Sequence, residues 1–321
     1  MRVLVTGGAG FIGSNLTEAL LQDERITKVR VLDNLSTGLL KNIQPFLSNP
    51  KMEWIQGDIR DWNTCLDACK NIDAISHQAA LGSVPRSIND PITTNAVNIS
   101  GALNIFTAAK ENSINKIVYA ASSSTYGDSK ILPKTEDKIG KPLSPYAITK
   151  LVNELYADVF HKIYGIHFIG LRYFNVFGPK QNPQGAYAAV IPLFAKAVLN
   201  NTSPYINGDG LQSRDFTYVS NAVQANLLAL FTENQSAWNQ VYNIACGEQN
   251  SINDLFNSLV ASGPNPNLKP IHREERAGDV RDSLADISKA RKLLNYQPNI
   301  NLANGLKLAL DWYNKNANYF L

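Results

Sequence analysis

A glycine-rich turn near the start of the chain limits the possible folds more than any other feature. The segment VLVTGGAGFIGSNL places Gly7, Gly10 and Gly13 between an apolar run and a helical pattern. A side chain at Gly10 would block the close approach of a pyrophosphate, and Gly13 lets the helix pack on the strand. The unpaired N–H groups of the helix N-terminus then face the phosphates. The turn therefore predicts a dinucleotide site beside the first strand of a parallel sheet.

Short apolar runs alternate with longer helical patterns through the first half of the chain. We predict strands at 2–6, 29–33, 52–56, 74–77, 116–120 and 168–172, and helices near 12–22, 61–69, 92–111 and 146–163. Continuous apolar strands that alternate with helices are typical of a parallel sheet covered on both faces. The predicted fold class is α/β, with a doubly wound parallel sheet of the Rossmann type.

The alternation of strands and helices stops after about residue 175, where Gly and Pro become frequent. We expect this half to form a smaller α/β substrate-binding lobe over the carboxyl edge of the sheet. The prediction assigns residues 1–175, together with about 215–245, to the nucleotide-binding domain. It assigns residues 176–214 and 246–321 to the lobe.

The bulk composition argues against several classes of protein. A net charge of +3 in 321 residues is too weak and too scattered for nucleic-acid binding. There is no apolar run of about 18 residues, which a membrane span would need. The chain starts directly in a strand, so we expect no signal peptide and a cytoplasmic location. Cys65, Cys69 and Cys246 form neither a disulfide framework nor, with any nearby His, a metal site.

Two acidic residues follow predicted strands. Asp33 ends the second strand, twenty residues after Gly13. A carboxylate there accepts hydrogen bonds from an adenosine ribose and repels a 2′-phosphate, which favours NAD over NADP as the cofactor. Asp58 follows the third strand and is either an adenine contact or a helix cap, since Asp commonly caps helices.

Tyr146 and Lys150 lie four residues apart on a predicted helix, so they share one face. A tyrosine pKa of about 10 is too high for a base near neutrality. A lysine ammonium one turn away, together with a cationic nicotinamide, would favour the phenolate. The pair therefore predicts a proton-transfer site, and a solvated helix face is the alternative with the same spacing.

Three consecutive serines follow the fifth predicted strand, in the segment AASSSTYGD. Ser122, Ser123 and Ser124 would lie at the carboxyl edge of the sheet, where ligands bind such folds. A hydroxyl at this edge can relay a proton between a substrate oxygen and the tyrosine. The alternative interpretation is a polar strand end followed by a turn.

Taken together, these segments resemble the extended short-chain dehydrogenases/reductases along essentially the whole chain. The resemblance is carried by TGGAGFIG, the strand end at Asp33, GDIRD, HQAA, the serine run and YAITK. A second set of segments is similar to the UDP-N-acetylhexosamine 4-epimerases, which are related to the UDP-glucose/galactose 4-epimerases. That set is AALGSVPRSINDP, AASSSTYGD, LRYFNVFGP, GAYAAVIP, YINGDG, SRDFTYV and RAGDVRDSLADISKA.

The resemblance implies a reaction cycle with tightly held NAD and a UDP-sugar substrate. Tyr146 would remove the proton of the sugar 4-hydroxyl while C4 gives a hydride to the nicotinamide. The 4-keto sugar would turn over, and the hydride would return to its other face. Lys150 would hold the nicotinamide ribose and lower the pKa of the tyrosine. Ser122 aligns best with the catalytic Ser/Thr, with Ser123 and Ser124 as alternatives because this loop is two residues shorter than SSSATVYG.

The resemblance also implies two sets of binding residues. The cofactor contacts are Gly7, Gly10, Phe11, Ile12, Gly13, Asp33, Asn34, Gly38, Asp58, Ile59, Gln78, Ala80, Asn98, Tyr146, Lys150 and Tyr173. The substrate contacts are Ser83, Ser122, Ser123, Asn175, Ala189, Val190, Tyr205, Asn207, Arg214, Arg276, Asp279 and Ser283. The two arginines suit forked binding of a diphosphate. Ser283 leaves room for an N-acetyl group where some relatives have a bulky residue.

The residues of the serine run bear on which other activities of the same superfamily are possible. A 4,6-dehydratase would need an Asp-Glu pair where this chain has Ser-Ser-Thr, and a uronic-acid decarboxylase would need a Glu. Removal of a hydroxyl by general acid–base catalysis therefore lacks its group. A net oxidoreductase stays open, as does a non-catalytic NAD-sensing regulator, a class that typically loses the Tyr-Lys pair. The sugar is left open among the UDP-N-acetylhexosamines, UDP-glucose/UDP-galactose and UDP-uronic acids, and cell-surface polysaccharide synthesis is the expected pathway.

A homodimer is expected by analogy, through the helices near 92–111 and 146–163. Their apolar faces carry Ala102, Ile105, Phe106, Leu151, Leu155 and Val159. A face that is buried in the core of a single chain would show the same pattern.

Overall fold

The central layer of the molecule is one parallel sheet. The computed structural model describes residues 1–183, 189–274 and 281–317. Within them, seven strands lie in the order β11-β6-β5-β4-β1-β2-β3. Their bounds are β1 (Arg2–Thr6), β2 (Lys28–Asp33), β3 (Met52–Gln56), β4 (Ala74–His77), β5 (Lys116–Ser122), β6 (His167–Tyr173) and β11 (Gln240–Ile244). The order reverses between β1 and β4, and the doubly wound α/β fold is confirmed.

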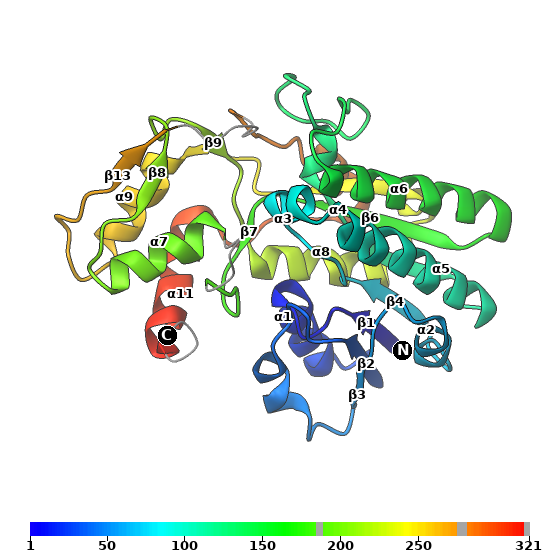
Figure 1. The fold of residues 1–321 in the computed structure, drawn as a ribbon. Coiled ribbons are helices and arrows are strands. Elements are labelled where there is room, and N and C mark those ends of the chain that lie inside the picture. Colours follow the sequence, from blue (N-terminus) through cyan, green and yellow to red (C-terminus); the bar gives the residue numbers. More distant parts are fainter. Residues whose placement is uncertain (184–188, 275–280, 318–321) are drawn as a thin grey trace.

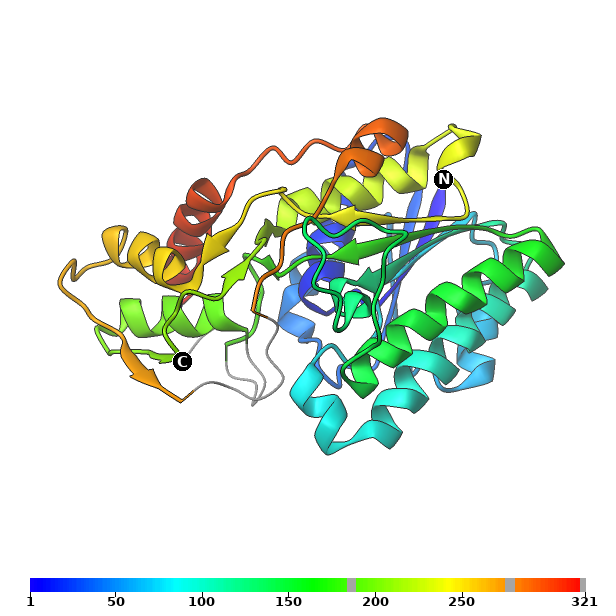
Figure 2. The ribbon, with the colours of Figure 1, turned by 90° about the horizontal axis from the view of Figure 1, so that it is seen from above.

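Helices cover both faces of this sheet (Figures 1 and 2). One face packs against α1 (Phe11–Gln22), α8 (Val219–Phe231) and α10 (Ser288–Leu294), and the other against α2 (Trp62–Ala68), α5 (Ala102–Glu111) and α6 (Pro145–Tyr164). Successive residues of β1 show why the strands are continuously apolar. Val3 and Val5 belong to the core on the α1 face, whereas Leu4 belongs to the core on the α5 face.

The helix predicted near 92–111 is confirmed, and it contains a π-helical turn. The structure has α3 (Val84–Asn89), then α4 (Pro91–Asn95), a π-helical turn over Ala96–Gly101, and α5. The π-turn contains the buried Asn98, whose side chain bonds to the backbone of Leu81 instead of facing outward. A π-turn changes the direction in which its side chains point, and such turns are frequent at functional sites.

The second half of the chain divides its elements between the sheet and a lobe beside it (Figure 1). Residues 219–244 supply α8 and β11 to the sheet layers. In its described residues, the lobe contains α7 (Val190–Leu199), α9 (Ile252–Ala261), α11 (Leu302–Lys315) and three short strand pairs. The pairs are β7 (Val176–Phe177) with β10 (Thr217–Tyr218), β8 (Tyr205–Asn207) with β13 (Ile271–Arg273), and β9 (Ser213–Arg214) with β12 (Asn250–Ser251). The smaller lobe is confirmed, and the exact domain boundaries stay a prediction.

Candidate active site

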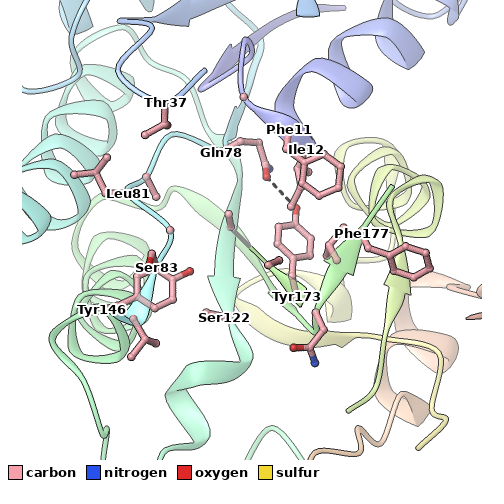
Figure 3. Close-up of a pocket in the computed structure, with 18 of the residues that line it drawn as sticks. Phe11, Ile12, Thr37, Gln78, Leu81, Ser83, Ser122, Tyr146, Tyr173 and Phe177 are labelled. Carbon is pink, nitrogen blue, oxygen red and sulfur yellow. Dashed lines mark hydrogen bonds between the residues drawn. The ribbon is translucent and has the colours of Figure 1, made fainter. Parts of the chain in front are cut away.

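A cavity of about 1030 Å³ lies at the carboxyl edge of the sheet, between the strand ends and the lobe. Its lining residues come from the ends of β1, β2, β4, β5 and β6 and from α6, α7, β8, β9 and β13. Figure 3 shows side chains from the sheet and from the lobe converging on this space. A cavity of this size lies at the upper end of the usual range for ligand sites, which fits a ligand as large as a dinucleotide.

The glycine-rich turn forms one end of the cavity and has the predicted geometry. Gly7 has a φ of +70°, and a Cβ added there would come within 2.6 Å of the backbone nitrogen of Ala79. A Cβ on Gly13 would lie 2.1 Å from the carbonyl oxygen of Gly7. Among the described residues, no side chain caps the N-terminus of α1, so its first N–H groups are available to an anion. These residues fit a bound pyrophosphate.

Asp33 lines the cavity at the end of β2 and is buried. Its carboxylate accepts hydrogen bonds from the backbone N–H of Ala9 at 3.0 Å and of Leu35 at 2.8 Å. Burial raises the pKa of this carboxyl, and the backbone N–H groups oppose the shift. Gly38 does not line the cavity but packs on Asp33, because a Cβ there would lie 3.0 Å from Oδ2. The structure thus keeps an acid where a ribose would bind.

Asp58 lines the same region of the cavity and does not cap the following helix. That role belongs to Asp61, whose side chain accepts a hydrogen bond from the N–H of Thr64 at 2.7 Å. Asp58 instead bonds Arg60 at 2.7 Å and accepts a hydrogen bond from Asn34 at 2.9 Å. The Arg60 guanidinium is the main reason that the pKa of Asp58 falls to about 2. The carboxylate is therefore ionised and available as an acceptor.

Tyr146 and Lys150 both line the cavity from the first turns of α6. The helix begins at Pro145, and the preceding Ser144 caps it by accepting a hydrogen bond from the N–H of Ala147. Lys150 is buried, and its Nζ donates to the carbonyl oxygen of Ala120 at 2.9 Å and lies 5.9 Å from the centre of the Tyr146 ring. Helix and strand thus hold the lysine beside the phenol.

Burial dominates the acid–base properties of this pair. It lowers the pKa of Lys150 to about 8, while the nearby Glu154 carboxylate raises it. Burial also raises the pKa of Tyr146, and an interaction with the Ser122 hydroxyl lowers it. The protein alone therefore favours a protonated Tyr146, and the positive charge of a bound nicotinamide would shift the balance toward the phenolate.

The three serines have different surroundings. Ser122 ends β5, which runs two residues beyond the predicted strand, and both Ser122 and Ser123 line the cavity. Ser124 does not line it, and it donates to Ser122 Oγ through its N–H at 3.1 Å and its hydroxyl at 2.8 Å. Because Ser122 Oγ accepts both bonds, its own proton is left to donate toward Tyr146. This geometry favours Ser122 over its neighbours.

Asn98 supports the cavity wall without lining it. Its side chain accepts a hydrogen bond from the N–H of Leu81 at 2.8 Å and donates to the carbonyl oxygen of Leu81 at 3.2 Å. It also donates to Thr149 Oγ1 on α6 at 3.1 Å. Asn98 therefore connects the segment after β4 to the helix that carries Tyr146.

The lobe contributes a polar group around β8 and β13. Tyr205, Asn207 and Arg214, which the resemblance gives as substrate contacts, line the cavity, and Arg273 joins them. Arg273 pairs with Asn207 in the β8–β13 register, and its Nε donates to Asn207 Oδ1 at 2.6 Å. Its guanidinium lies 5.2 Å from the centre of the Tyr205 ring. Arg273 is not predicted from the sequence, because its three-residue strand carries no periodic pattern.

The predicted site residues fall into three groups. Those that line the cavity are Gly7, Gly10, Phe11, Ile12, Gly13, Asp33, Asn34, Asp58, Ile59, Gln78, Ala80, Ser83, Ser122, Ser123, Tyr146, Lys150, Tyr173, Asn175, Ala189, Val190, Tyr205, Asn207 and Arg214. Those that are described but lie outside its lining are Gly38, Asn98 and Ser283. Ser283 instead donates its N–H to the carbonyl oxygen of Ser213 at 3.1 Å. Arg276 and Asp279 lie outside the described residues.

Comparison with known proteins identifies relatives along the whole chain. Residues 3–245 match a family described as the NAD dependent epimerase/dehydratase family. A putative UDP-glucose 4-epimerase from Methanocaldococcus jannaschii is 38% identical over 318 residues, which cover 98% of this chain and 99% of that protein. The match confirms the family suggested by the sequence, and with it NAD as the cofactor.

Two solved structures show the same architecture with different sugars. A UDP-N-acetylglucosamine 4-epimerase from Methanobrevibacter ruminantium, in complex with UDP-N-acetylmuramic acid, has a TM-score of 0.90 and 39% identity, covering 98% of each chain. A UDP-glucuronic acid 4-epimerase from Bacillus cereus, in complex with UDP-glucuronic acid and NAD, has a TM-score of 0.89 and 33% identity, covering 98% of this chain and 99% of that one. In the described part of the chain, no helix is long and apolar enough to cross a membrane.

Proposed function

The chain belongs to the NAD dependent epimerase/dehydratase family, in its nucleotide-sugar 4-epimerase branch, and on that premise we propose that it inverts C4 of a UDP-N-acetylhexosamine. The interconverted pair would be UDP-GlcNAc and UDP-GalNAc. The observation that carries the proposal is the convergence of Tyr146, Lys150 and Ser122 on one cavity that a dinucleotide turn also lines. UDP-glucose/UDP-galactose and the UDP-uronic acids are the alternative substrates.

The chemistry of each residue follows from its contacts. When bound, NAD supplies the site that accepts a hydride from C4 and later returns it. Tyr146 takes the proton of the 4-hydroxyl and gives it back, and the Ser122 proton stabilises the phenolate oxygen or the sugar oxygen. Lys150 places its positive charge beside the phenol because its Nζ is fixed by the carbonyl oxygen of Ala120. The cavity would leave room for the keto sugar to turn over beside the residues that hold NAD.

The serine loop argues against loss of water from the sugar. A dehydratase needs an acid that protonates the leaving hydroxyl, yet residues 123–125 read Ser-Ser-Thr. The carboxylates of Asp33 and Asp58 line the cavity at the ends of β2 and β3 and not at the serine loop. Inversion at C4 therefore fits the available groups better than elimination.

The experiment that tests the proposal uses the purified protein without added NAD. UDP-GlcNAc is incubated with it, and the anomeric signals are followed by proton NMR. We expect UDP-GalNAc to appear until an equilibrium mixture is reached, and we expect Y146F to abolish the conversion. Tyr156 lies on the same helix but outside the cavity lining, so Y156F is the matched control. Conversion of UDP-glucose or a UDP-uronic acid alone would replace the substrate, and no conversion of any of them with NAD supplied would overturn the proposal.

We also propose that the protein is a homodimer through α6 and its neighbour α4. Leu155 and Val159 are exposed on α6, where they join Ile163 at 64% exposure, and Ile92 on α4 is 82% exposed. The predicted helix near 92–111 contributes through its first turn, α4, whereas Ala102, Ile105 and Phe106 of α5 are buried. An exposed apolar helix face of this kind is typical of a subunit interface. A cytoplasmic location and a role in polysaccharide synthesis accompany the proposal as predictions.

A charge placed in this face tests the dimer. We expect L155E to shift the protein from dimer to monomer in sedimentation velocity, because a carboxylate cannot be buried there without a partner. The matched control is L308E. Leu308 is exposed on α11 in the lobe, so we expect this variant to remain a dimer. A monomeric wild-type protein at micromolar concentration would contradict the proposal.

A further inference from the structure

A fully buried asparagine on α8 lies at the centre of a closed hydrogen-bond network next to the cavity. Asn226 has no exposed surface. Its Nδ2 donates to the Tyr173 hydroxyl at 2.7 Å and to the carbonyl oxygen of Ala222 at 2.8 Å. Its Oδ1 accepts from Gln78 Nε2 at 3.0 Å and from Ser76 Oγ at 3.2 Å. Every donor and acceptor of this amide is therefore used, which is the condition under which a buried polar group is stable.

The donors and acceptors of this network can be assigned in one way only. The carbonyl oxygen of Ala222 can only accept, so the Asn226 nitrogen must face it, and the same nitrogen then donates to the Tyr173 hydroxyl. The Tyr173 proton is consequently left for Gln78 Oε1, at 3.1 Å, as the dashed line in Figure 3 marks. The Gln78 nitrogen faces the other way, toward Ser76 Oγ at 2.9 Å and Asn226. Asn226 thus decides which end of the Gln78 amide faces Tyr173.

Two members of the network are also part of the cavity wall. Gln78 and Tyr173 line the cavity, whereas Asn226 and Ser76 do not. The Gln78 backbone is packed against the phosphate turn, since a Cβ on Gly7 would lie 2.9 Å from its carbonyl carbon. Burial raises the pKa of the Tyr173 hydroxyl to about 12, so it keeps its proton at neutral pH. This part of the wall is therefore neutral. Its two side chains are held by hydrogen bonds to residues that lie outside the cavity lining.

We propose that Asn226 is a positioning residue for cofactor binding, which holds Gln78 and Tyr173 in the one arrangement that leaves the dinucleotide site open. This inference rests on the proposed function only in taking the ligand of this part of the cavity to be NAD. Without Asn226, the Tyr173 hydroxyl and the Gln78 amide each lose a buried partner. A buried polar group that has lost its partner costs free energy until it finds another. The nearest replacement is water in the cavity, so both side chains turn into the space that the cofactor needs.

The test compares two asparagines of the same helix. Asn221 is also buried on α8 and fully bonded, with Nδ2 donating to the carbonyl oxygen of Ile300 and Oδ1 accepting from the N–H groups of Asn299 and Ile300. Among the described residues, its hydrogen bonds go to neither Gln78 nor Tyr173, and it does not line the cavity. N226A and N221A therefore remove similar buried amides, and only N226A disturbs the cavity wall.

The measured quantity is the Kd for NAD of the stripped protein, determined by titration, with the fluorescence of bound NADH as a second signal. We expect N226A to weaken binding roughly tenfold, the size expected from one to two lost buried hydrogen bonds, and N221A to leave it unchanged. Equal Kd values for both variants would overturn the inference. Because no sugar is present, failure of the epimerase assay with normal NAD binding would count against the proposed function and not against this inference.

A second variant keeps the test decisive if N226A does not fold. Y173F removes the hydroxyl that links Asn226 to Gln78 Oε1 and leaves the direct bond from Gln78 Nε2 to Asn226 in place. We expect it to weaken NAD binding, but by no more than N226A does. In the double variant N226A/Y173F, binding should be no weaker than in N226A, because the Tyr173 hydroxyl acts through the same network as Asn226. Additive losses, or a Y173F protein with unchanged NAD binding, would contradict the inference.

Discussion

The two sides of the cavity are built differently. On the sheet side, Tyr146 and Lys150 stand on a helix of 20 residues, and Ser122 ends a central strand of seven. On the lobe side, Tyr205 and Arg273 stand on strands of three residues, and both are exposed. Rigid elements hold reacting groups to small tolerances, whereas short segments tolerate change. On the proposed function, we therefore expect the sheet side to fix the chemistry and the lobe side to set which molecule is accepted.

The largest expected effect is on stability, and it comes from the buried ion pair between β6 and α6. Arg172 and Glu154 are 2.7 Å apart, with side-chain exposures of 3% and 10%. Replacing Arg172 by Met would leave a buried carboxylate without its partner, which costs about 3–5 kcal/mol of unfolding free energy. On the same helix, Lys162 and Asp158 form an exposed pair, and D158A should change stability by at most about 1 kcal/mol. Urea unfolding checks both values, and equal losses would break the comparison.

Substitutions in the serine run test which hydroxyl on the sheet side takes part in proton transfer. We expect S122A to lower kcat about 100-fold, the usual lower range for loss of a proton-transferring group. S124A should have a smaller effect, because its hydroxyl acts only through Ser122 Oγ. Steady-state assays of the three variants S122A, S123A and S124A measure the order. A larger loss in S123A than in S122A would move the relay to the neighbouring residue.

The pH dependence of the unfolding free energy tests the lowered pKa of Lys150 in the absence of any ligand. Its folded pKa is about 8, below the ordinary value of 10.5, so between these values the unfolded chain binds more protons than the folded one. Stability therefore rises with pH through this window, by at most about 1.4 kcal/mol per pH unit from this group. K150M should remove the rise. Urea unfolding of the wild-type protein and K150M at pH 8 and pH 10 measures this difference. The same change in unfolding free energy between the two pH values in both proteins would contradict the prediction.

Arg273 gives the smallest expected effect and examines the lobe side. We expect R273A to raise KM roughly tenfold with little change in kcat, because a contact kept through the reaction contributes to binding alone. His272 is the neighbour on the same strand and does not line the cavity, so H272A is the matched control. A fall in kcat with an unchanged KM would show that the lobe also takes part in the chemistry.

The sequence predicts those parts of the site whose geometry is local. Gly7, Gly13 and Asp33 are set by a strand and the turn after it, and Tyr146 and Lys150 are set by the helix period. Their identity and spacing therefore contain the geometry. The same reasoning placed six of the seven sheet strands within two residues at each end.

The parts that the sequence could not supply depend on distant pairing. Arg273 meets Asn207 only because β13 pairs with β8, and Asn226 meets Gln78 only because α8 packs behind β4. Leu155 and Phe106 show the same limit for burial. Both occupy apolar helix faces, yet one is exposed and the other is buried against the sheet. Periodicity identifies such a face, and tertiary packing decides what covers it.

The place of β11 in the sheet has a consequence for how the chain is made. β6 pairs with β5 on one side and with β11 on the other, and β11 is encoded only after the first segments of the lobe. A ribosome delivers the chain from its N-terminus, so a nascent chain with six completed strands has an open edge at β6. An open edge is a template for pairing with another chain. Until residues 240–244 emerge, the newborn protein is therefore exposed to aggregation, and this is the stage at which a chaperone would have most to protect.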